Sequence, residues 1–198
     1  MSKRLFDLAV SLPALALLSP LLLGIAAAIK LDSPGPVFFR QERVGLHGRP
    51  FRIHKFRTMV ADAERSGPQL TRAGDPRVTR VGAFLRRHKL DELAQLIDVV
   101  RGDMSIVGPR PEVPRYVALY PQDVRGVVLS VRPGITDAAS VEYKDESAQL
   151  AAAADPEQLY VSVIMPQKLK LCVHYVRNRS LAGDLAIVAR TLAALLRP

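Results

Sequence analysis

The sequence predicts an α+β protein that is mainly helical, with an N-terminal re-entrant (helix-break-helix) membrane anchor, a small β-hairpin and several short amphipathic interfacial helices. Three observations predict this class. Residues 8–29 carry no charge, segments 37–44 and 51–56 have the composition of short strands, and prolines divide the chain beyond residue 111 into short pieces. A chain of 198 residues has room for one domain with a real core.

Composition indicates an anionic partner and a membrane surface. The chain has 28 Lys and Arg against 19 Asp and Glu, a net charge of +9, which suits nucleic acid, acidic lipid or a phosphorylated substrate. A hydrophobic content of 48% favours the membrane surface. Cys172 is the only cysteine, which excludes an intrachain disulfide and favours the reducing cytoplasmic side. We therefore expect a membrane segment at about residues 5–30 and a cytosolic and interfacial core at about residues 31–198.

The uncharged run 8–29 would extend ~33 Å as a helix, which just crosses a hydrocarbon core of ~30 Å. Ser19 and Pro20 lie in its middle, where proline removes a helical hydrogen bond and favours a kink. Basic residues on both flanks draw both ends to the cytoplasm, namely Lys3, Arg4, Lys30, Arg40 and Arg43. The residues alone leave a re-entrant and a spanning helix equally open. A secretory signal peptide ending near residues 26–28 is a third reading.

The two predicted strands are joined into a hairpin by the glycine- and proline-containing turn 45–50. Alternation places Ile53 and Lys55 on one face of the second strand and His54 and Phe56 on the other. The four histidines of the chain lack zinc-ligand spacing, so we expect surface or satisfied residues.

Glycine and proline residues predict a mobile loop over residues 62–76. A group of cations overlaps the end of this loop and faces a single acid, Asp75. The cations are Arg72, Arg77, Arg80, Arg86, Arg87 and Lys89. On a soluble protein such a group suggests nucleic acid, whereas beside a membrane anchor it suits anionic head groups.

The stretch 84–111 concentrates residues that suit phosphate chemistry. Apolar residues at three- and four-residue steps predict a helix over residues 90–101 that ends at Gly102. Asp91 and Glu92 fall in its first turn, where the helix dipole favours ionised carboxylates and attracts phosphate. Because consecutive helical residues point about 100° apart, we expect that the two carboxylates do not face one point. Ordinary first-turn acids are the alternative.

Divided roles suit this pair, because one carboxylate can attack a phosphorus atom while the other holds Mg2+. Arg86 can steady phosphate oxygens with its fork of donors. Pro109 and Pro111 fix the backbone on both sides of Arg110, so the loop aims that guanidinium.

Several sequence blocks, in order, resemble the bacterial sugar transferase family, the small monotopic phosphoglycosyl transferases. The stretch 84–111 contains L-D-E-L-x-Q-L and G-D-M-S-x-V-G-P-R-P, and the other blocks are K-R-L-F-D at 3–7, P-V-F-F-R-Q-E-R-V-G at 36–45, H-K-F-R-T-M at 54–59 and R-P-G-I-T at 132–136. The likeness covers nearly the whole chain. It implies a single catalytic domain over residues 1–198 and favours the re-entrant anchor, with its kink at Ser19 and Pro20.

The resemblance implies transfer of a sugar 1-phosphate from a UDP-sugar to a polyprenol (undecaprenyl) phosphate, with release of UMP, as the first membrane step of bacterial surface glycan biosynthesis. It implies that Asp91 forms a covalent phosphosugar-aspartyl intermediate, that Glu92 with Asp91 binds Mg2+, and that Arg86 is catalytic. The substrate-binding residues that it implies are Lys55, Arg57, Pro109, Arg110 and Pro111.

The resemblance also implies a monotopic protein on the cytoplasmic face of the cytoplasmic membrane, in contact with anionic lipid and without a nucleic-acid partner. Glycosyltransferases of the same pathway are further candidate partners. Two rival functions stay open, a membrane-tethered nucleic-acid binder and a non-catalytic scaffold for glycan assembly.

Two positions depart from the family pattern. Relatives usually continue G-[LW]-[WA]-Q-V after the R-P-G-I-T block, whereas this chain has Asp137 followed by A-A-S-V, so the choice of sugar is open. Cys172 stands where relatives commonly have Asp, so no role of that acid is carried over.

Apolar residues mark two later segments. An edge suited to the lipid interface is formed by Tyr116, Leu119, Tyr120 and Val124. The last segment carries an apolar stripe on a helix that either packs on the core or lies on lipid, namely Leu181, Leu185, Val188, Leu192, Leu195 and Leu196.

Overall fold

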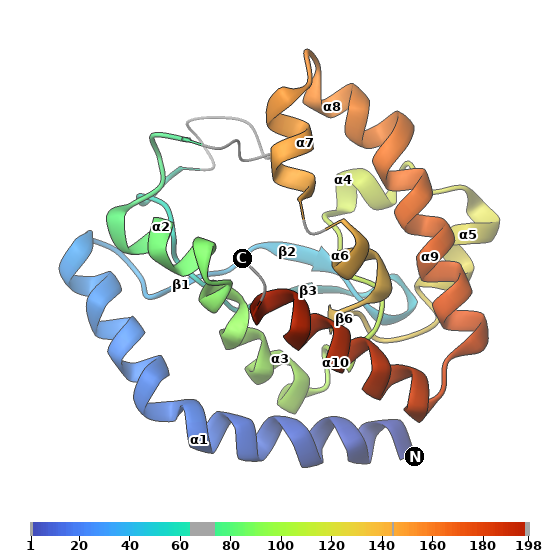
Figure 1. The fold of residues 1–198 in the computed structure, drawn as a ribbon, viewed down its shortest axis with the longest axis horizontal. Coiled ribbons are helices and arrows are strands. Elements are labelled where there is room, and N and C mark those ends of the chain that lie inside the picture. Colours follow the sequence, from blue (N-terminus) through green and yellow to red (C-terminus); the bar gives the residue numbers. More distant parts are fainter. Residues whose placement is uncertain (1, 64–73, 144, 197–198) are drawn as a thin grey trace.

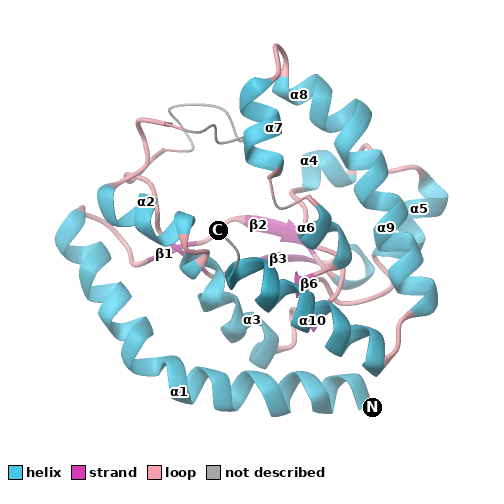
Figure 2. Ribbon diagram, in the orientation of Figure 1, coloured by secondary structure: helices cyan, strands magenta, loops and turns pink. Residues whose placement is uncertain are grey.

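The computed structural model describes residues 2–63, 74–143 and 145–196, and it confirms a mainly helical α+β protein with small two-stranded sheets (Figure 2). The helices, with 3-10 and π segments written η, are α1 (Ser2–Asp32), η1 (Leu46–Gly48), α2 (Arg80–Arg87), η2 (Leu90–Gln95), α3 (Leu96–Arg101), α4 (Pro114–Val117), α5 (Gln122–Val128), α6 (Ala138–Glu142), α7 (Glu146–Ala152), α8 (Pro156–Leu159), η3 (Tyr160–Ile164), α9 (Met165–Asn178) and α10 (Leu181–Leu196). The strands are β1 (Phe38–Phe39), β2 (Glu42–Val44), β3 (Pro50–Arg52), β4 (Lys55–Phe56), β5 (Ser105–Val107) and β6 (Gly134–Thr136).

Helix α1 runs along one side of the molecule and bends about midway (Figure 1). It is long and apolar enough to cross a membrane by length and composition, with a mean hydropathy of 2.2 over a stretch of which 11% is buried. Pro20 lies inside the helix and lacks the N–H that would bond the Ala16 carbonyl. The Ser19 hydroxyl donates to that carbonyl instead, at 2.8 Å. Ser19 and Pro20 therefore lie within one continuous helix that bends about midway, and the re-entrant path of the anchor stays a prediction.

The start of α1 is bonded to the core of the protein. Arg4 donates to the carbonyl of Val100 near the end of α3, at 2.8 Å. Asp7 is buried and accepts from the Ser105 hydroxyl at 2.9 Å and from the Ile106 N–H at 3.0 Å, both on β5. Buried polar groups need such partners, so these bonds fix the first turns of the helix against the core.

The other end of α1 is bonded to the same core. The Arg57 guanidinium donates to the carbonyls of Ser33 and Pro34, both at 2.7 Å, just beyond the last helical residue. Asp32 accepts from the Val81 N–H at the start of α2, at 3.0 Å. The C-terminal end of a helix leaves backbone carbonyl groups without helical partners. Arg57 bonds the carbonyls of Ser33 and Pro34, just beyond the C-terminal end of α1.

The predicted hairpin is confirmed, although each predicted strand is divided in two. β1 pairs with β4 and β2 pairs with β3, both antiparallel, and Phe39 lies opposite Lys55. Ile53 and Phe56 belong to different hydrophobic clusters, as the predicted alternation requires. His54 is a satisfied buried residue, because its N–H donates to the Asp98 carboxylate at 2.8 Å and its ring contacts the same group.

A third pairing joins β5 and β6 in parallel, with Ser105 opposite Gly134, and the sequence did not predict it. The two backbones meet closely, because a Cβ on Gly134 would lie 2.1 Å from the Gly108 nitrogen. Gly108 donates to the Thr136 carbonyl at 3.1 Å, and Gly134 donates to the Pro109 carbonyl at 3.0 Å. The backbone on the N-terminal side of Arg110 is therefore held against β6.

One expectation about lipid-facing residues needs correction. Tyr116 faces inward and belongs to a core cluster with Tyr160, whereas Leu119 is exposed. The predicted edge therefore packs mostly on the protein, because Tyr116, Tyr120 and Val124 join the cluster that contains buried residues of α9. Over residues 181–194 of α10, Asp184 and Ile187 are buried while Leu181, Leu185 and Leu192 are exposed, so the two alternatives for this helix, packing on the core or lying on lipid, stay open.

Replacing Gly134 with alanine should destabilise the protein, because the added Cβ would collide with the backbone of Gly108. We expect a lower midpoint of thermal unfolding in detergent, equivalent to about 1–3 kcal/mol. Gly126→Ala is the matched control, since its surroundings are open and alanine is favoured over glycine inside a helix such as α5 by about 1 kcal/mol. A Gly134→Ala midpoint at or above that of the wild type would contradict this packing.

Candidate active site

The helix predicted over residues 90–101 forms as two segments. Its first half is the 3-10 segment η2 and its second half is α3, which ends at Gly102 with a left-handed φ of 91°. Lys89, just before it, also has a left-handed φ of 56° and turns the chain sharply out of α2. This turn brings the first residues of η2 against β4, the strand that ends the hairpin.

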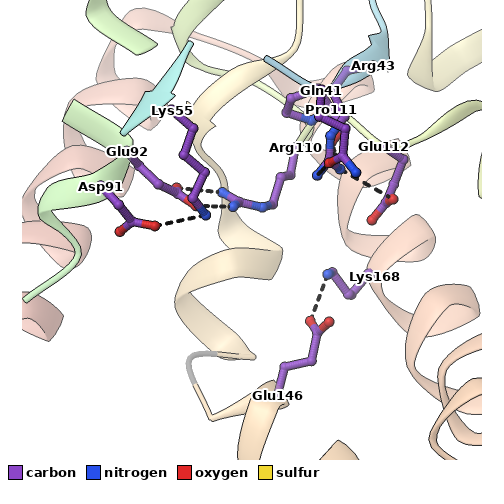
Figure 3. A network of polar contacts seen from close by, with 10 residues as sticks. All are labelled: Gln41, Arg43, Lys55, Asp91, Glu92, Arg110, Pro111, Glu112, Glu146 and Lys168. Atoms are coloured by element: carbon purple, nitrogen blue, oxygen red, sulfur yellow. Dashed lines mark hydrogen bonds and ion pairs between the residues drawn. The ribbon is translucent and has the colours of Figure 1, made fainter. Parts of the chain in front are cut away.

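Asp91 and Glu92 both contact Lys55, which reaches them from β4 (Figure 3). The Lys55 ammonium lies 2.9 Å from Asp91 Oδ2 and 3.3 Å from Glu92 Oε1. The expectation that the two carboxylates do not face one point is therefore wrong. The directions of their Cα–Cβ bonds do diverge, but the long, flexible side chains of Glu92 and Lys55 close the distance.

Arg110 binds Glu92 as a two-pronged ion pair. Its Nη1 donates to Glu92 Oε2 at 2.9 Å, and a second, shorter bond joins Nη2 and Oε1. Burial opposes ionisation of Glu92, but the positive charges of Arg110 and Lys55 outweigh it and hold the pKa of Glu92 below its ordinary value. The charge of Glu92 in turn raises the pKa of Arg110. Glu92 is thus a fixed anion at neutral pH.

Asp91 is held less completely than Glu92. It is 3% exposed, and the contact found for it within the described chain is the Lys55 ion pair through Oδ2. One carboxylate oxygen therefore remains without a protein donor among the described residues. A carboxylate in this state is better placed to attack an electrophile than one whose two oxygens are both bonded.

Arg86 lies beside this group of residues. Its Nε donates to the Thr58 hydroxyl at 2.8 Å, which aims the side chain. Burial lowers the pKa of Arg86, and the nearby charge of Asp91 partly offsets that effect. Among the described residues Arg86 forms no ion pair with a carboxylate.

The structure thus brings together four of the predicted residues, Lys55, Asp91, Glu92 and Arg110. Arg57 is not among them, because its guanidinium is directed at the end of α1. Ser19 and Pro20 lie within α1. Pro109 and Pro111 flank Arg110, and their carbonyls accept from Gly134 and from Arg43, respectively, both at 3.0 Å.

The predicted cation group has mixed roles. Arg77 is bonded to Asp75 through several nitrogens, and these bonds lower the pKa of Asp75 to about 2. Arg80, Arg87 and Lys89 are exposed. Arg72 and residues 64–73 of the predicted loop lie outside the described residues.

Sequence reasoning missed two residues behind the site. Arg43 donates to the carbonyl of Pro111 and lies 3.7 Å from Glu112, the next residue along. Asp137 accepts from the Arg110 N–H at 3.2 Å. Arg43 comes from β2, and Asp137 directly follows β6, which pairs with β5. These contacts link residues far apart in the chain, and no local sequence pattern signals them.

The donor set of Asp91 and Glu92 fits Mg2+. Both offer carboxylate oxygens, and each oxygen of Glu92 can accept a further bond beside those from Arg110 and Lys55. Within the described chain no group of three or more His, Cys, Asp or Glu residues could hold a metal ion. Substrate phosphates and water would have to complete the coordination, which is the usual habit of Mg2+.

Comparisons with known proteins agree with this geometry. The family model described as bacterial sugar transferase matches residues 1–198. A UDP-glucose:undecaprenyl-phosphate glucose-1-phosphate transferase of Caulobacter vibrioides is 42% identical over 98% of this chain and 69% of the relative. A UDP-N-acetylgalactosamine-undecaprenyl-phosphate N-acetylgalactosaminephosphotransferase of Aeromonas hydrophila is 40% identical over 98% of this chain. A UDP-glucose:undecaprenyl-phosphate glucose-1-phosphate transferase of Escherichia coli is 41% identical over 96% of this chain.

The chain spans 43% of the Aeromonas relative and 39% of the Escherichia coli relative, so these proteins contain regions that the comparison does not cover. The matched part nevertheless includes nearly every residue described above. Given a family match over its whole length, this chain belongs to the bacterial sugar transferase family.

Proposed function

We propose that this chain transfers a sugar 1-phosphate from a UDP-sugar to a polyprenol phosphate such as undecaprenyl phosphate, and releases UMP. The observation that carries the proposal is the buried Asp91 carboxylate, paired with Lys55 at 2.9 Å beside the ion pair of Glu92 and Arg110. Relatives named as UDP-glucose:undecaprenyl-phosphate glucose-1-phosphate transferases support it.

The reaction would have two steps. In the first, an oxygen of Asp91 attacks the phosphorus that bears the sugar; a P–O bond forms, the bond to the UMP phosphate breaks, and UMP leaves with its electron pair. In the second, an oxygen of the polyprenol phosphate attacks the same phosphorus and the Asp91 carboxylate is released. The second step yields a diphosphate-linked lipid and restores the enzyme.

Positive side chains around Asp91 make its approach to an anionic diphosphate feasible. Like charges repel strongly in a partly dry site, so Lys55 and Arg86 would bind phosphate oxygens while Arg110 fixes Glu92. Mg2+, when bound by Glu92 and Asp91, would neutralise part of the diphosphate charge. Pro109 and Pro111 would keep Arg110 in place through both steps.

The same proposal includes a monotopic membrane attachment on the cytoplasmic face, with α1 entering and leaving one leaflet. Both ends of α1 are bonded to one core, through Arg4 and Asp7 at the start and Arg57 beyond the end. A helix anchored at both ends to a single cytosolic body cannot place those ends on opposite sides of a bilayer. The exposed leucines of the middle, such as Leu17 at 81%, supply the lipid-facing surface.

Asp91→Asn should abolish UMP release and the labelling of the protein by a phosphate-labelled UDP-sugar. The amide is a poor nucleophile, so we expect activity to fall by on the order of 10³-fold or more in nanodiscs with polyprenol phosphate. Asp123→Asn, on the exposed side of α5, is the control that should retain both signals. Labelling that persists in Asp91→Asn would remove Asp91 as the nucleophile. A wild type that releases no UMP from a panel of UDP-sugars would favour a nucleic-acid binder or a scaffold.

Glu92→Gln should weaken the dependence on Mg2+, because it removes one anionic ligand and the charge that Arg110 binds. We expect the Mg2+ concentration for half-maximal UMP release to rise about tenfold or more, as for the loss of a ligand or its supporting partner. Glu142→Gln, an exposed residue at the end of α6, serves as the control. An unchanged Mg2+ titration would contradict the metal role of Glu92.

Cysteines introduced at Leu5 and Leu31, which are 71% and 89% exposed, test the path of α1. Re-entry predicts that an impermeant maleimide labels both variants from the cytoplasmic side, in inverted vesicles, and neither from the outside. The wild type is the control, because its Cys172 is buried and should not react. Labelling of the two positions from opposite sides would refute re-entry.

A further inference from the structure

The backbone of Arg110 has a partner that the proposed reaction does not use. Pro109 and Pro111 have no N–H, so Arg110 supplies the one backbone donor of these three residues. That N–H donates to Oδ2 of Asp137 at 3.2 Å. The orientation of Arg110 therefore depends on a side chain 27 residues away in the sequence.

Asp137 is 2% exposed and lies just before α6, where its Oδ1 accepts from the Ser140 N–H at 2.6 Å. Helix capping accounts for this one oxygen. It does not account for Oδ2, which faces Arg110 and the thiol of Cys172, whose sulfur lies 3.6 Å away. A buried carboxylate is tolerated only when such donors surround it.

Cys172 lies on α9 and is itself 9% exposed. Burial and the neighbouring charge of Asp137 raise the pKa of the thiol, so it stays protonated and can donate to the carboxylate. The contacts thus form a chain from α9 to η2: Cys172 touches Asp137, Asp137 holds the backbone of Arg110, and Arg110 holds Glu92.

We propose that Asp137 is a positioning residue for the phosphosugar transfer, which fixes the backbone of Arg110 so that its guanidinium meets Glu92, and that Cys172 fixes the orientation of Asp137. The inference rests on the proposed function for its kinetic part. The geometric part concerns the Arg110–Glu92 ion pair alone and can be measured without substrate.

Asp137→Asn separates positioning from capping. The carbonyl oxygen of the asparagine can still accept from the Ser140 N–H. The NH2 group, which replaces Oδ2, is a donor and cannot accept from the Arg110 N–H, so that hydrogen bond is lost. We expect kcat for UMP release to fall about tenfold or more, because Arg110 is no longer aimed at Glu92, and the lost hydrogen bond should also lower the unfolding midpoint. The control is Asp155→Asn, which caps α8 through the Gln158 N–H and should leave kcat unchanged.

A double-mutant cycle shows whether Asp137 acts through Arg110. In an Arg110→Ala background, Asp137→Asn should lower kcat by less than about twofold, because the side chain that it positions is gone. Cys172→Ser, which retains a donor, should keep kcat, whereas Cys172→Ala should lower it. An unchanged kcat in Asp137→Asn, or an equal loss in both backgrounds, would overturn the proposal.

Modification of Arg110 by phenylglyoxal, followed by mass spectrometry of its peptide, gives a readout that needs no UDP-sugar. Release of the guanidinium from Glu92 should raise the modification rate in Asp137→Asn but not in Asp155→Asn. If the wild type releases no UMP yet this rate rises, the proposed function fails and the positioning role stands. An unchanged rate overturns the positioning role whatever the kinetics.

Discussion

The ion pair between Arg110 and Glu92 is the contact on which the rest of the active site depends. The two residues belong to separate parts of the chain, the loop after β5 and the 3-10 segment η2, and each is the main charge partner of the other. The Arg110 and Glu92 side chains are 35% and 20% exposed, so removing one partner would leave a partly buried charge uncompensated. The loop and η2 must therefore be held within hydrogen-bond distance of each other.

Two structural devices meet that requirement. The glycine contact between Gly108 and Gly134 lets β5 and β6 approach closely enough to fix the loop, since any side chain there would push the strands apart. On the other side, the hairpin carries Lys55 onto η2, and the buried pair of His54 and Asp98 fixes the strand residue just before Lys55. Lys55 of β4 and Arg110 of the loop after β5 thus contact the carboxylates from two separate parts of the chain.

The difference between Asp91 and Glu92 follows from this arrangement. Glu92 has both oxygens bonded to cations, so its position and charge are fixed, as a metal ligand requires. Asp91 is held through one oxygen by Lys55, so it can turn toward a phosphorus atom without breaking the Arg110 ion pair. Adjacent carboxylates with different numbers of partners can divide the two roles that the reaction needs.

Local patterns in the sequence predicted much of this fold. Apolar spacing identified the helix over residues 90–101 and its end at Gly102, and alternation identified the hairpin. The pairing of β5 with β6 was missed, because strands of three residues carry too short a pattern to be read. The helix stays continuous at Ser19 and Pro20 because a hydroxyl satisfies the carbonyl that proline leaves unpaired, a bond that depends on a side-chain rotamer and that no sequence pattern predicts.

The structure brings some of the predicted site residues together and leaves others apart. Lys55, Asp91, Glu92 and Arg110 were identified through motifs and do gather. Arg57 shares a motif with Lys55, and strand alternation would place both on one face, but β4 ends at Phe56 and the Arg57 guanidinium bonds the carbonyls beyond the end of α1.

The two departures from the family pattern, Asp137 and Cys172, were noted separately in the sequence, and they touch each other in the fold. A carboxylate at residue 137 needs an uncharged neighbour at residue 172, because a second buried acid beside it would repel it in a site of low dielectric. The two residues therefore act as one unit, and the loss of the donor at residue 172 or of the acceptor at residue 137 alters the support of Arg110.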